Sequence, residues 1–309
     1  MALPDHLKQL AARVSNTGRW GADDERGTLN LIDPAAVLRG IAAVRQGRTF
    51  SLAIPFDEDG PQTGAIPTGR ENPRRKMLAV NAAYTGDPGD FCANDDAVAM
   101  GVQAATHWDA LAHVSYGGRL YNGIDASVVD ERGAGRLGIQ HYGPVVTRGV
   151  LADVARVHGV EHFDDGHVIT GDDLDAAVAQ AGLTVEPGDA LMVRTGHMHF
   201  LRAGDRERFA HPSPGLSTRS IEWLRDHDVA AVATDTLVFE VWPCEDPAVL
   251  LPVHMIHLVD MGLAQGQLWA LDDLAADCAA DGQYDFLLCA TPLPLTRAVG
   301  GPVAPTAVK

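Results

Sequence analysis

The chain lacks long apolar runs, and we expect no leader sequence at its start. No stretch of its 309 residues approaches the roughly 18 apolar residues that a membrane span needs. The first eight residues contain no basic cap followed by an apolar run, so they do not resemble a secretory signal. Hydrophobic residues make up 46% and charged residues 21%, which is ordinary for a globular protein. We therefore expect a cytoplasmic protein with no membrane partner.

Cysteine is also scarce. The four cysteines are scattered through the chain and form neither a Cys-x-x-Cys pair nor a zinc-finger spacing: Cys92, Cys244, Cys278 and Cys289. This pattern argues against a disulfide framework and against a cysteine-based metal site. We expect free thiols in a reducing compartment.

Positive charge is in short supply. Lysine occurs only at positions 8, 76 and 309, and the formal net charge is −17. Such a field repels nucleic acid and anionic membrane surfaces, so neither is expected as a partner. A small molecule is the expected ligand. If that ligand is an anion, a bound metal ion would make the electrostatic potential near the site locally positive.

Hydrophobic periodicity indicates mixed strands and helices. Asp33 and Pro34 predict the start of a helix, and Gly47 predicts its end. Strands are predicted at 48–55, 97–109, 144–154, 189–195, 229–235 and 284–290, and helices from Thr170, at 217–227 and at 248–262, before a proline-rich tail. No repeat or linker divides the chain. We therefore predict one α/β domain over 1–309, opened by a helical segment at 1–47.

Residues 56–76 are rich in glycine, proline and charge, and they are too polar to belong to a core. Connections of this length are usually functional or disordered. Two interpretations remain open, a lid over a functional site and a plain surface excursion.

The stretch richest in chemistry runs from Gln103 to His113, with the sequence QAATHWDALAH. Residues 103, 107 and 109 have the same parity, so an extended strand would project Gln103, His107 and Asp109 from one face. These side chains would then hold one divalent ion, and His113 would accept a proton from a metal-bound water. The alternative is that they are unrelated polar residues on a half-buried strand. Trp108 points the other way and is expected to pack.

This stretch resembles the signature His-x-Gly-Thr-His-x-Asp-x-Pro-x-His of the metal-dependent cyclase superfamily, which includes bacterial-type kynurenine formamidase and isatin hydrolase. Thr106, His107, Asp109 and His113 match in type and spacing. Further similar segments extend across most of the chain: 19–21, 27–30, 120–123, 147–150, 193–196 and 234–236. The resemblance implies a swivelling β/β/α-type fold with a mixed sheet. It also implies a homodimer or homotetramer.

Two glutamines depart from the family pattern. Gln103 stands where the family has its first metal-binding histidine, and an amide oxygen favours Mn²⁺ or Mg²⁺ over Zn²⁺ if it binds metal at all. His254 matches the C-terminal histidine of binuclear formamidases, but Gln267 stands at the place of their glutamate. The resemblance therefore implies one divalent metal ion, Mn or Zn, rather than two. His254 is either a further ligand or a structural residue.

The resemblance implies a metal-dependent hydrolase of a small amide, cyclic amide or lactone, with His113 as the general base. Substrate contacts are expected from Trp20, Asn122 and Asp235, with turn capping as the alternative for Asp235. Two other classes stay open. One is a lyase or cyclase that uses the metal to polarise a carbonyl. The other is a non-catalytic binder of small molecules, which the two glutamines favour.

Overall fold

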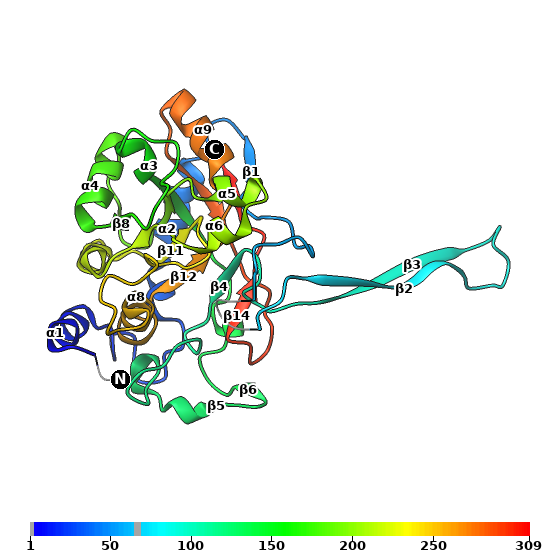
Figure 1. The fold of residues 1–309 in the computed structure, drawn as a ribbon, viewed down its shortest axis with the longest axis horizontal. Coiled ribbons are helices and arrows are strands. Elements are labelled where there is room, and N and C mark those ends of the chain that lie inside the picture. Colours follow the sequence, from blue (N-terminus) through cyan, green and yellow to red (C-terminus); the bar gives the residue numbers. More distant parts are fainter. Residues whose placement is uncertain (1–2, 65–68) are drawn as a thin grey trace.

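A nine-stranded mixed sheet forms the centre of the molecule (Figure 1). The structure, a computed structural model, describes residues 3–64 and 69–309. The strand order is β1-β15-β13-β7-β9-β11-β12-β4-β14. The middle four strands run parallel, and their bounds are Val146–Asp153 (β7), Ala190–Arg194 (β9), Ala231–Thr234 (β11) and Ala264–Gln267 (β12). The predicted α/β class with a mixed sheet is confirmed.

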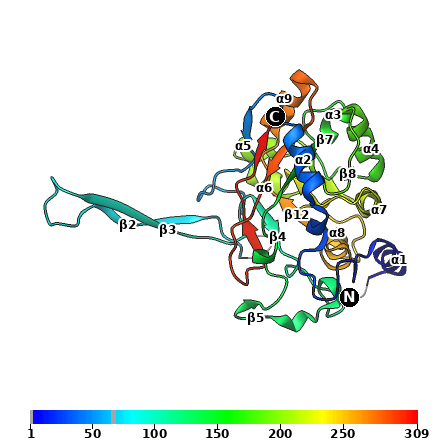
Figure 2. The ribbon, with the colours of Figure 1, turned by 180° about the vertical axis from the view of Figure 1, so that it is seen from behind.

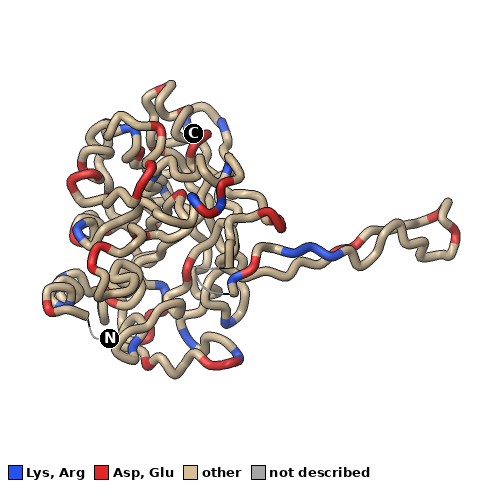
Figure 3. Tube along the Cα trace, viewed as in Figure 1, with Lys and Arg blue, Asp and Glu red and all other residues tan. Residues whose placement is uncertain are grey.

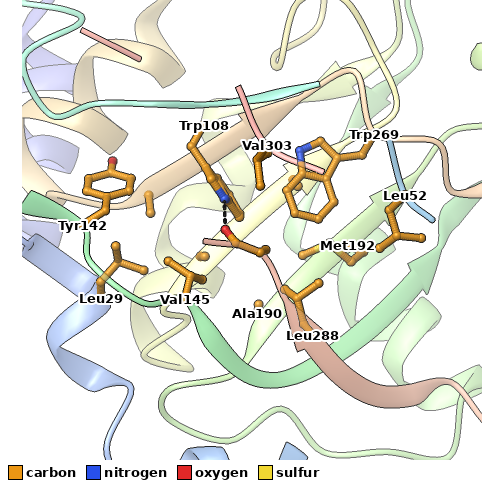
Figure 4. Packing of buried hydrophobic residues seen from close by; sticks show 14 of the residues in the cluster. Leu29, Leu52, Trp108, Tyr142, Val145, Ala190, Met192, Trp269, Leu288 and Val303 are labelled. Carbon is orange, nitrogen blue, oxygen red and sulfur yellow. Dashed lines mark hydrogen bonds between the residues drawn. The ribbon is translucent and has the colours of Figure 1, made fainter. Parts of the chain in front are cut away.

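The parallel strands are buried on both faces, which is why their sequences read as nearly continuous apolar runs. Along β9, Leu191 and Val193 belong to one hydrophobic cluster, whereas Ala190 and Met192 belong to another. Figure 4 shows part of the cluster that contains Ala190 and Met192, in which Met192 lies near Trp269. The sheet therefore separates two cores.

Helices cover both faces of the sheet. α2 (Pro34–Ala42) packs against β7 and β13 (Asp285–Cys289), and Figure 2 shows it from behind the molecule. The predicted cap is confirmed, because the Asp33 side chain accepts a hydrogen bond from the backbone N–H of Ala36. The helix ends at Ala42, before the predicted stop at Gly47. The other longer helices are α1 (Asp5–Val14), α4 (Gly171–Gln180), α7 (Ile221–Asp226) and α9 (Asp272–Asp281).

Short elements complete the connections. They are η1 (Gly27–Leu31), η2 (Tyr121–Gly123), η3 (Ala126–Val128), β5 (Val129–Asp130), β6 (Gly133–Ala134), η4 (Ile139–His141), α3 (Val154–Val157), β8 (Val168–Ile169), α5 (Met198–Arg202), α6 (Arg206–Ala210), β10 (Gly215–Leu216), η5 (Thr218–Ser220), α8 (Pro252–Met255) and the π-helical η6 (Ile256–Met261). Among the residues that the structure describes, no helix combines the length and apolarity needed to cross a membrane.

The C-terminal tail belongs to the sheet, which its proline-rich sequence did not indicate. β14 (Gly300–Pro302) pairs with β4 (His107–Asp109), and β15 (Thr306–Val308) lies between β13 and β1 (Thr49–Ser51). β1 is also shorter than the strand predicted at 48–55. Two segments far apart in sequence thus form the edges of the sheet.

The strand predicted at 97–109 was wrong. β3 (Cys92–Ala99) ends before the motif, and a turn closed by the 3.0 Å hydrogen bond from Ala104 N to Gly101 O separates it from β4. β3 pairs instead with β2 (Arg74–Ala83), and the two strands form a hairpin that projects far from the body (Figure 1). We call this hairpin, residues 74–99, the arm.

Asp235 joins the ends of two central strands. Its buried carboxylate accepts hydrogen bonds from Thr195 N (3.0 and 3.1 Å), from Thr195 Oγ1 (2.7 Å) and from Gly196 N (2.8 Å). The residue thereby ties the end of β11 to the end of β9. Burial, together with the carboxylate of Asp272, raises the pKa of Asp235 to about 6.

The Asp235→Ala variant should be less stable by about 3 kcal/mol, because it leaves two buried backbone N–H groups without an acceptor. The free energy of unfolding in urea measures this effect. Asp226→Ala removes an exposed carboxylate as a control and should change stability by less than about 0.5 kcal/mol. Equal stability of the two variants would show that the Asp235 contacts are not structural.

The stability difference between the parent protein and the Asp235→Ala variant should depend on pH. The pKa of Asp235 is higher in the folded chain, about 6, than the ordinary value of about 3.9 in an unfolded one. The folded state therefore holds this proton more tightly, and the resulting stability is full below about pH 4 and is lost as pH rises through about 6. The stability difference between the parent and Asp235→Ala should shrink over that range. A difference that stays constant would contradict the raised pKa.

Candidate functional site

The short strand β4 carries the centre of the site. It pairs on one side with β12 and on the other with β14, so the three residues of β4 are held by backbone ladders on both edges. Trp108 points into the core, where its indole nitrogen donates to the Ala290 carbonyl at 2.8 Å and its ring meets Trp269 edge-on (Figure 4). His107 and Asp109 therefore share the opposite face.

His107 offers an imidazole nitrogen with no partner. Its Nδ1 lies 2.7 Å from the Ala105 carbonyl oxygen, which only accepts, so Nδ1 carries the proton and Nε2 carries the lone pair. The side chain is buried, and no hydrogen-bond partner of Nε2 exists among the described residues. A backbone carbonyl that fixes the tautomer in this way is typical of metal-binding histidines.

Asp109 is unsatisfied on the side that faces His107. Its Oδ2 accepts hydrogen bonds from the amides of Gln265 (3.1 Å) and Gln267 (2.8 Å), whereas buried Oδ1 has no hydrogen-bond partner in the described part of the chain. Burial opposes ionisation, but the imidazoles of His113 and His107 outweigh it and hold the pKa of Asp109 well below its ordinary value. The group is a carboxylate at neutral pH.

The two unsatisfied atoms fit one divalent cation. His107 Nε2 and Asp109 Oδ1 are 3.4 Å apart. Two ligands at ordinary zinc–nitrogen and zinc–oxygen distances in a tetrahedral site would be about 3.4 Å apart. One imidazole and one carboxylate also suit Mn²⁺ or Zn²⁺. The residues present therefore fit a metal ion.

Gln103 lies in the turn before β4 and not on the strand, which corrects the prediction of a common strand face. Its amide nitrogen donates to the Val299 carbonyl at 3.2 Å and contacts His113 Nδ1 at 3.1 Å. Because an amide nitrogen cannot accept, His113 Nδ1 is the acceptor and the proton of the neutral ring is on Nε2. Gly300 makes room for Gln103, since a Cβ at that position would lie 2.6 Å from the amide nitrogen.

His113 is the most accessible member of the group, with 23% of its side chain exposed. Its Nε2 lies 3.7 Å from Asp109 Oδ1. Burial lowers the pKa of His113, and the attraction of Asp109 offsets only part of that effect. The ring is thus neutral at pH 7, and its N–H is directed at the site.

His254 is buried on the other side of Asp109, on α8. Its Nδ1 lies 2.7 Å from Glu240 Oε1, so Nδ1 carries the proton and donates it in a hydrogen bond to the carboxylate, and the lone pair is on Nε2. Gln267 contacts that Nε2 at 3.4 Å while also donating to Asp109. The structure therefore brings His254 and Gln267 together beside Asp109.

Part of the segment proposed as a lid, 56–76, packs beside the site. Gln62 is buried and donates to the Ala104 carbonyl at 2.9 Å, and Arg70 reaches the Gln103 carbonyl at 3.4 Å. Burial lowers the pKa of the Arg70 guanidinium, against the attraction of Asp109. Residues 65–68 lie outside the described part of the chain, and residues from Arg74 onward belong to the arm.

The three predicted substrate residues have other contacts. The Arg19 guanidinium lies over the ring of Trp20, with its central carbon 4.8 Å from the ring centroid. The Asn122 side chain bonds Gly18 N, Gly21 O and Ala22 O. The Asp235 carboxylate accepts hydrogen bonds from Thr195 and Gly196, as described above. No hydrogen bond or ion pair between described residues joins any of the three to His107 or Asp109, and their binding of substrate stays a prediction.

Sequence reasoning missed Gln265, Glu240 and Arg70. Gln265 and Gln267 are two residues apart on β12, so strand alternation was a signal that both face Asp109. Glu240 carries no comparable signal, because it lies in a loop 14 residues before the histidine that it orients. Arg70 was hidden within a polar segment.

A second group of possible ligands lies away from β4. His158, His167 and Asp173 have ligand atoms within 4.8 Å of one another. Asp173, however, already accepts from His158 (2.8 Å) and closes the capping box of α4 with Thr170. His158 is also exposed. Helix capping accounts for this group, and it provides a control for metal measurements.

Comparisons with known proteins agree with this architecture. A family model described as "Putative cyclase" matches residues 50–241. No curated protein matches the chain. A crystal structure described as a novel cyclase is 37% identical, with a TM-score of 0.87, and the match covers 96% of this chain and 99% of that one.

Two more distant structures share the fold. Isatin hydrolase A from Ralstonia solanacearum is 18% identical, with a TM-score of 0.62, and the match covers 88% of this chain and 95% of that one. A predicted metal-dependent hydrolase from Bacillus stearothermophilus is 19% identical, with a TM-score of 0.52, over 84% and 97%. Since the family model spans more than half of the chain and the novel cyclase matches nearly all of it, the chain belongs to the cyclase family.

Proposed function

We propose that this protein is a metal-dependent hydrolase of a small amide, cyclic amide or lactone. The observation that carries the proposal is the buried pair His107 Nε2 and Asp109 Oδ1, both unpartnered among the described residues and 3.4 Å apart. Leaving two such atoms unsatisfied is costly, and one divalent cation satisfies both. Distant relatives of the same fold described as an isatin hydrolase and as a metal-dependent hydrolase support the reaction class.

His107 and Asp109 would hold the ion, with His254 Nε2 and the Gln103 amide oxygen as candidates for a further ligand. When bound, a divalent ion lowers the pKa of water and polarises a carbonyl group. The two amides of Gln265 and Gln267 fix Asp109 so that its free oxygen faces His107. This neutral support leaves the charge of the carboxylate available to the cation.

His113 is proposed as the catalytic residue. The sequence pattern suggested a proton acceptor, but Gln103 occupies the lone pair of Nδ1 and leaves a proton on Nε2. A neutral imidazole with this tautomer donates a hydrogen bond to the reacting carbonyl oxygen, where negative charge develops during attack. Its side chain is partly exposed, so a substrate can approach from its side.

Arg70 is proposed to attract the substrate. Among the described residues it forms no ion pair with a carboxylate, and its one hydrogen bond, to Gln103 O, is long at 3.4 Å. A half-buried guanidinium without a strong partner favours a carbonyl or carboxylate group of a ligand. In a chain of net charge −17, it provides local positive charge beside the site.

The proposed function is tested by loading the protein with Mn²⁺ or Zn²⁺ and measuring hydrolysis of three substrate classes. These are N-formyl aromatic amines, cyclic imides including isatin, and lactones. Turnover of one class that requires the metal supports the proposal. Substrate binding without turnover of any class would favour the non-catalytic alternative, and deuterium exchange without hydrolysis would favour the lyase.

His107→Ala and Asp109→Asn should each lower the metal content from about one ion per chain to near zero. Loss of a residue behind a metal ligand already costs 10–100-fold, so loss of the ligand itself should reduce turnover by at least about 100-fold. Metal analysis of protein purified without chelators gives the stoichiometry. His158→Ala is the control, because it disrupts the surface group of possible ligands and should leave both quantities unchanged. Metal lost in the control and retained in His107→Ala would place the ion elsewhere.

Gln103→Glu should move the His113 proton from Nε2 to Nδ1, because a carboxylate accepts where the amide donates. The ¹⁵N chemical shifts of the ring in metal-free protein distinguish the two tautomers. Gln103→Met is the control, since its thioether neither donates nor strongly accepts, and it should show a mixture. A parent protein whose His113 carries the proton on Nδ1 would refute the assigned donor role.

Arg70→Ala should raise KM by about 10-fold or more while changing kcat less, because a charged hydrogen bond to the bound substrate contributes about 1.5–3 kcal/mol. Initial rates over a range of substrate concentrations separate the two constants. Arg132→Ala removes an exposed guanidinium that pairs with Asp130 and should leave both unchanged. An Arg70→Ala enzyme with parental KM would show that Arg70 does not contact the substrate.

A further inference from the structure

The turn before β4, residues 100–106, contains no acidic or basic side chain (Figure 3). Its last four backbone carbonyls nevertheless all accept hydrogen bonds. Their partners are Arg70 for Gln103, Gln62 for Ala104, His107 Nδ1 for Ala105 and the backbone N–H of Val303 for Thr106. Hydrogen bonds from the segment 56–76, from β4 and from the residue after β14 therefore fix the path of the chain into the candidate site.

The side chain of Thr106 adds two more hydrogen bonds to this turn. The residue is fully buried and directly precedes His107. Its Oγ1 donates to the Leu268 carbonyl at 2.6 Å and accepts from the backbone N–H of Ile54 at 2.9 Å. Ile54 lies just before the segment 56–76, and Leu268 directly follows the last residue of β12. One hydroxyl group thus joins the start of β4 to two other segments that border the site.

Leu268 has an unusual backbone conformation. Its φ is 63°, in the left-handed region that a leucine rarely adopts, because its Cβ crowds the following carbonyl. Such a conformation persists only where neighbouring contacts hold it. Here the N–H of Leu268 donates to the Thr236 carbonyl at 3.1 Å, and its own carbonyl accepts from Thr106. The strained residue directly follows Gln267, whose amide orients Asp109.

We propose that Thr106 is a positioning residue for the metal pair, an inference that rests on the proposed metal-dependent function. On one side its hydroxyl fixes the turn, so that the Ala105 carbonyl stays on Nδ1 of His107. On the other side it fixes the end of β12, so that Gln267 stays on Asp109. The two free ligand atoms thereby keep their separation of 3.4 Å, which suits one ion.

Thr106→Val is compared with Thr28→Val as a matched control. Thr28 is also buried, and its Oγ1 also donates to a carbonyl, that of Ala230 at 2.8 Å, and accepts from a backbone N–H, that of Ala264 at 3.3 Å. These contacts lie at the start of β12 and not at its end. Calorimetric titration with Mn²⁺ or Zn²⁺ should show at least about 10-fold weaker binding in Thr106→Val, as for other residues that support metal ligands, and parental binding in Thr28→Val.

Two further variants separate the hydroxyl group from the shape of the side chain. Thr106→Ser keeps the hydroxyl and should bind the metal nearly as tightly as the parent. Thr106→Cys has a thiol, which is a weak donor, so its metal affinity should be lower than that of Thr106→Ser. This comparison remains decisive if the buried polar groups left without partners prevent Thr106→Val from folding.

A second measurement uses metal-free protein. The ¹⁵N chemical shifts of the His107 ring should show the proton on Nδ1 in the parent, because the Ala105 carbonyl accepts it. Thr106→Val should give a mixture of tautomers, whereas Thr28→Val and Thr106→Ser should keep the parental form. A protein that binds no metal but shows this change would refute the proposed function and support the role of Thr106.

Three results would overturn the role of Thr106. The first is equal metal affinity of folded Thr106→Val and Thr28→Val. The second is a loss of affinity in Thr106→Ser as large as in Thr106→Cys, because serine retains the hydroxyl. The third is a parental His107 tautomer in metal-free Thr106→Val.

Discussion

The candidate site depends on one short strand that cannot relax. β4 has three residues, and ladders on both edges together with the buried indole of Trp108 fix their orientation. The same alternation that sends Trp108 into the core holds His107 and Asp109 side by side on the other face. Neither side chain can turn toward water to satisfy its free lone pair. A cation that both atoms bind satisfies them without moving the sheet.

Neutral amides surround this pair and determine its electrostatics. Gln265 and Gln267 donate to Asp109, and Gln103 donates to His113. Glu240 is a second carboxylate near the pair, and it accepts a hydrogen bond from His254. Asp109 is thus the anionic group left for a cation among these contacts, which favours one ion over two. The amide of Gln103 also fixes the tautomer of His113.

The arm and the site meet at the turn of residues 100–106. This turn joins the end of β3 to β4 and carries Gln103, whose backbone carbonyl contacts Arg70. A groove at the base of the arm includes Pro302 of β14, the strand that flanks His107. The base of the arm and the edge of the candidate site therefore share the same few residues.

The sequence by itself determined the mixed α/β class, the helix caps at Asp33 and Thr170, and the shared face of His107 and Asp109. These features depend on contacts within a few residues, which periodicity and capping patterns report. Only the tertiary structure brought the amide of Gln267 to Asp109, which is 158 residues away in the sequence. It also brought Glu240 to His254 and paired β14 with the motif strand β4. It also replaced the predicted long strand with the arm and a turn. Sheet pairing and hydrogen bonds between distant segments decided these features, and no local pattern encodes them.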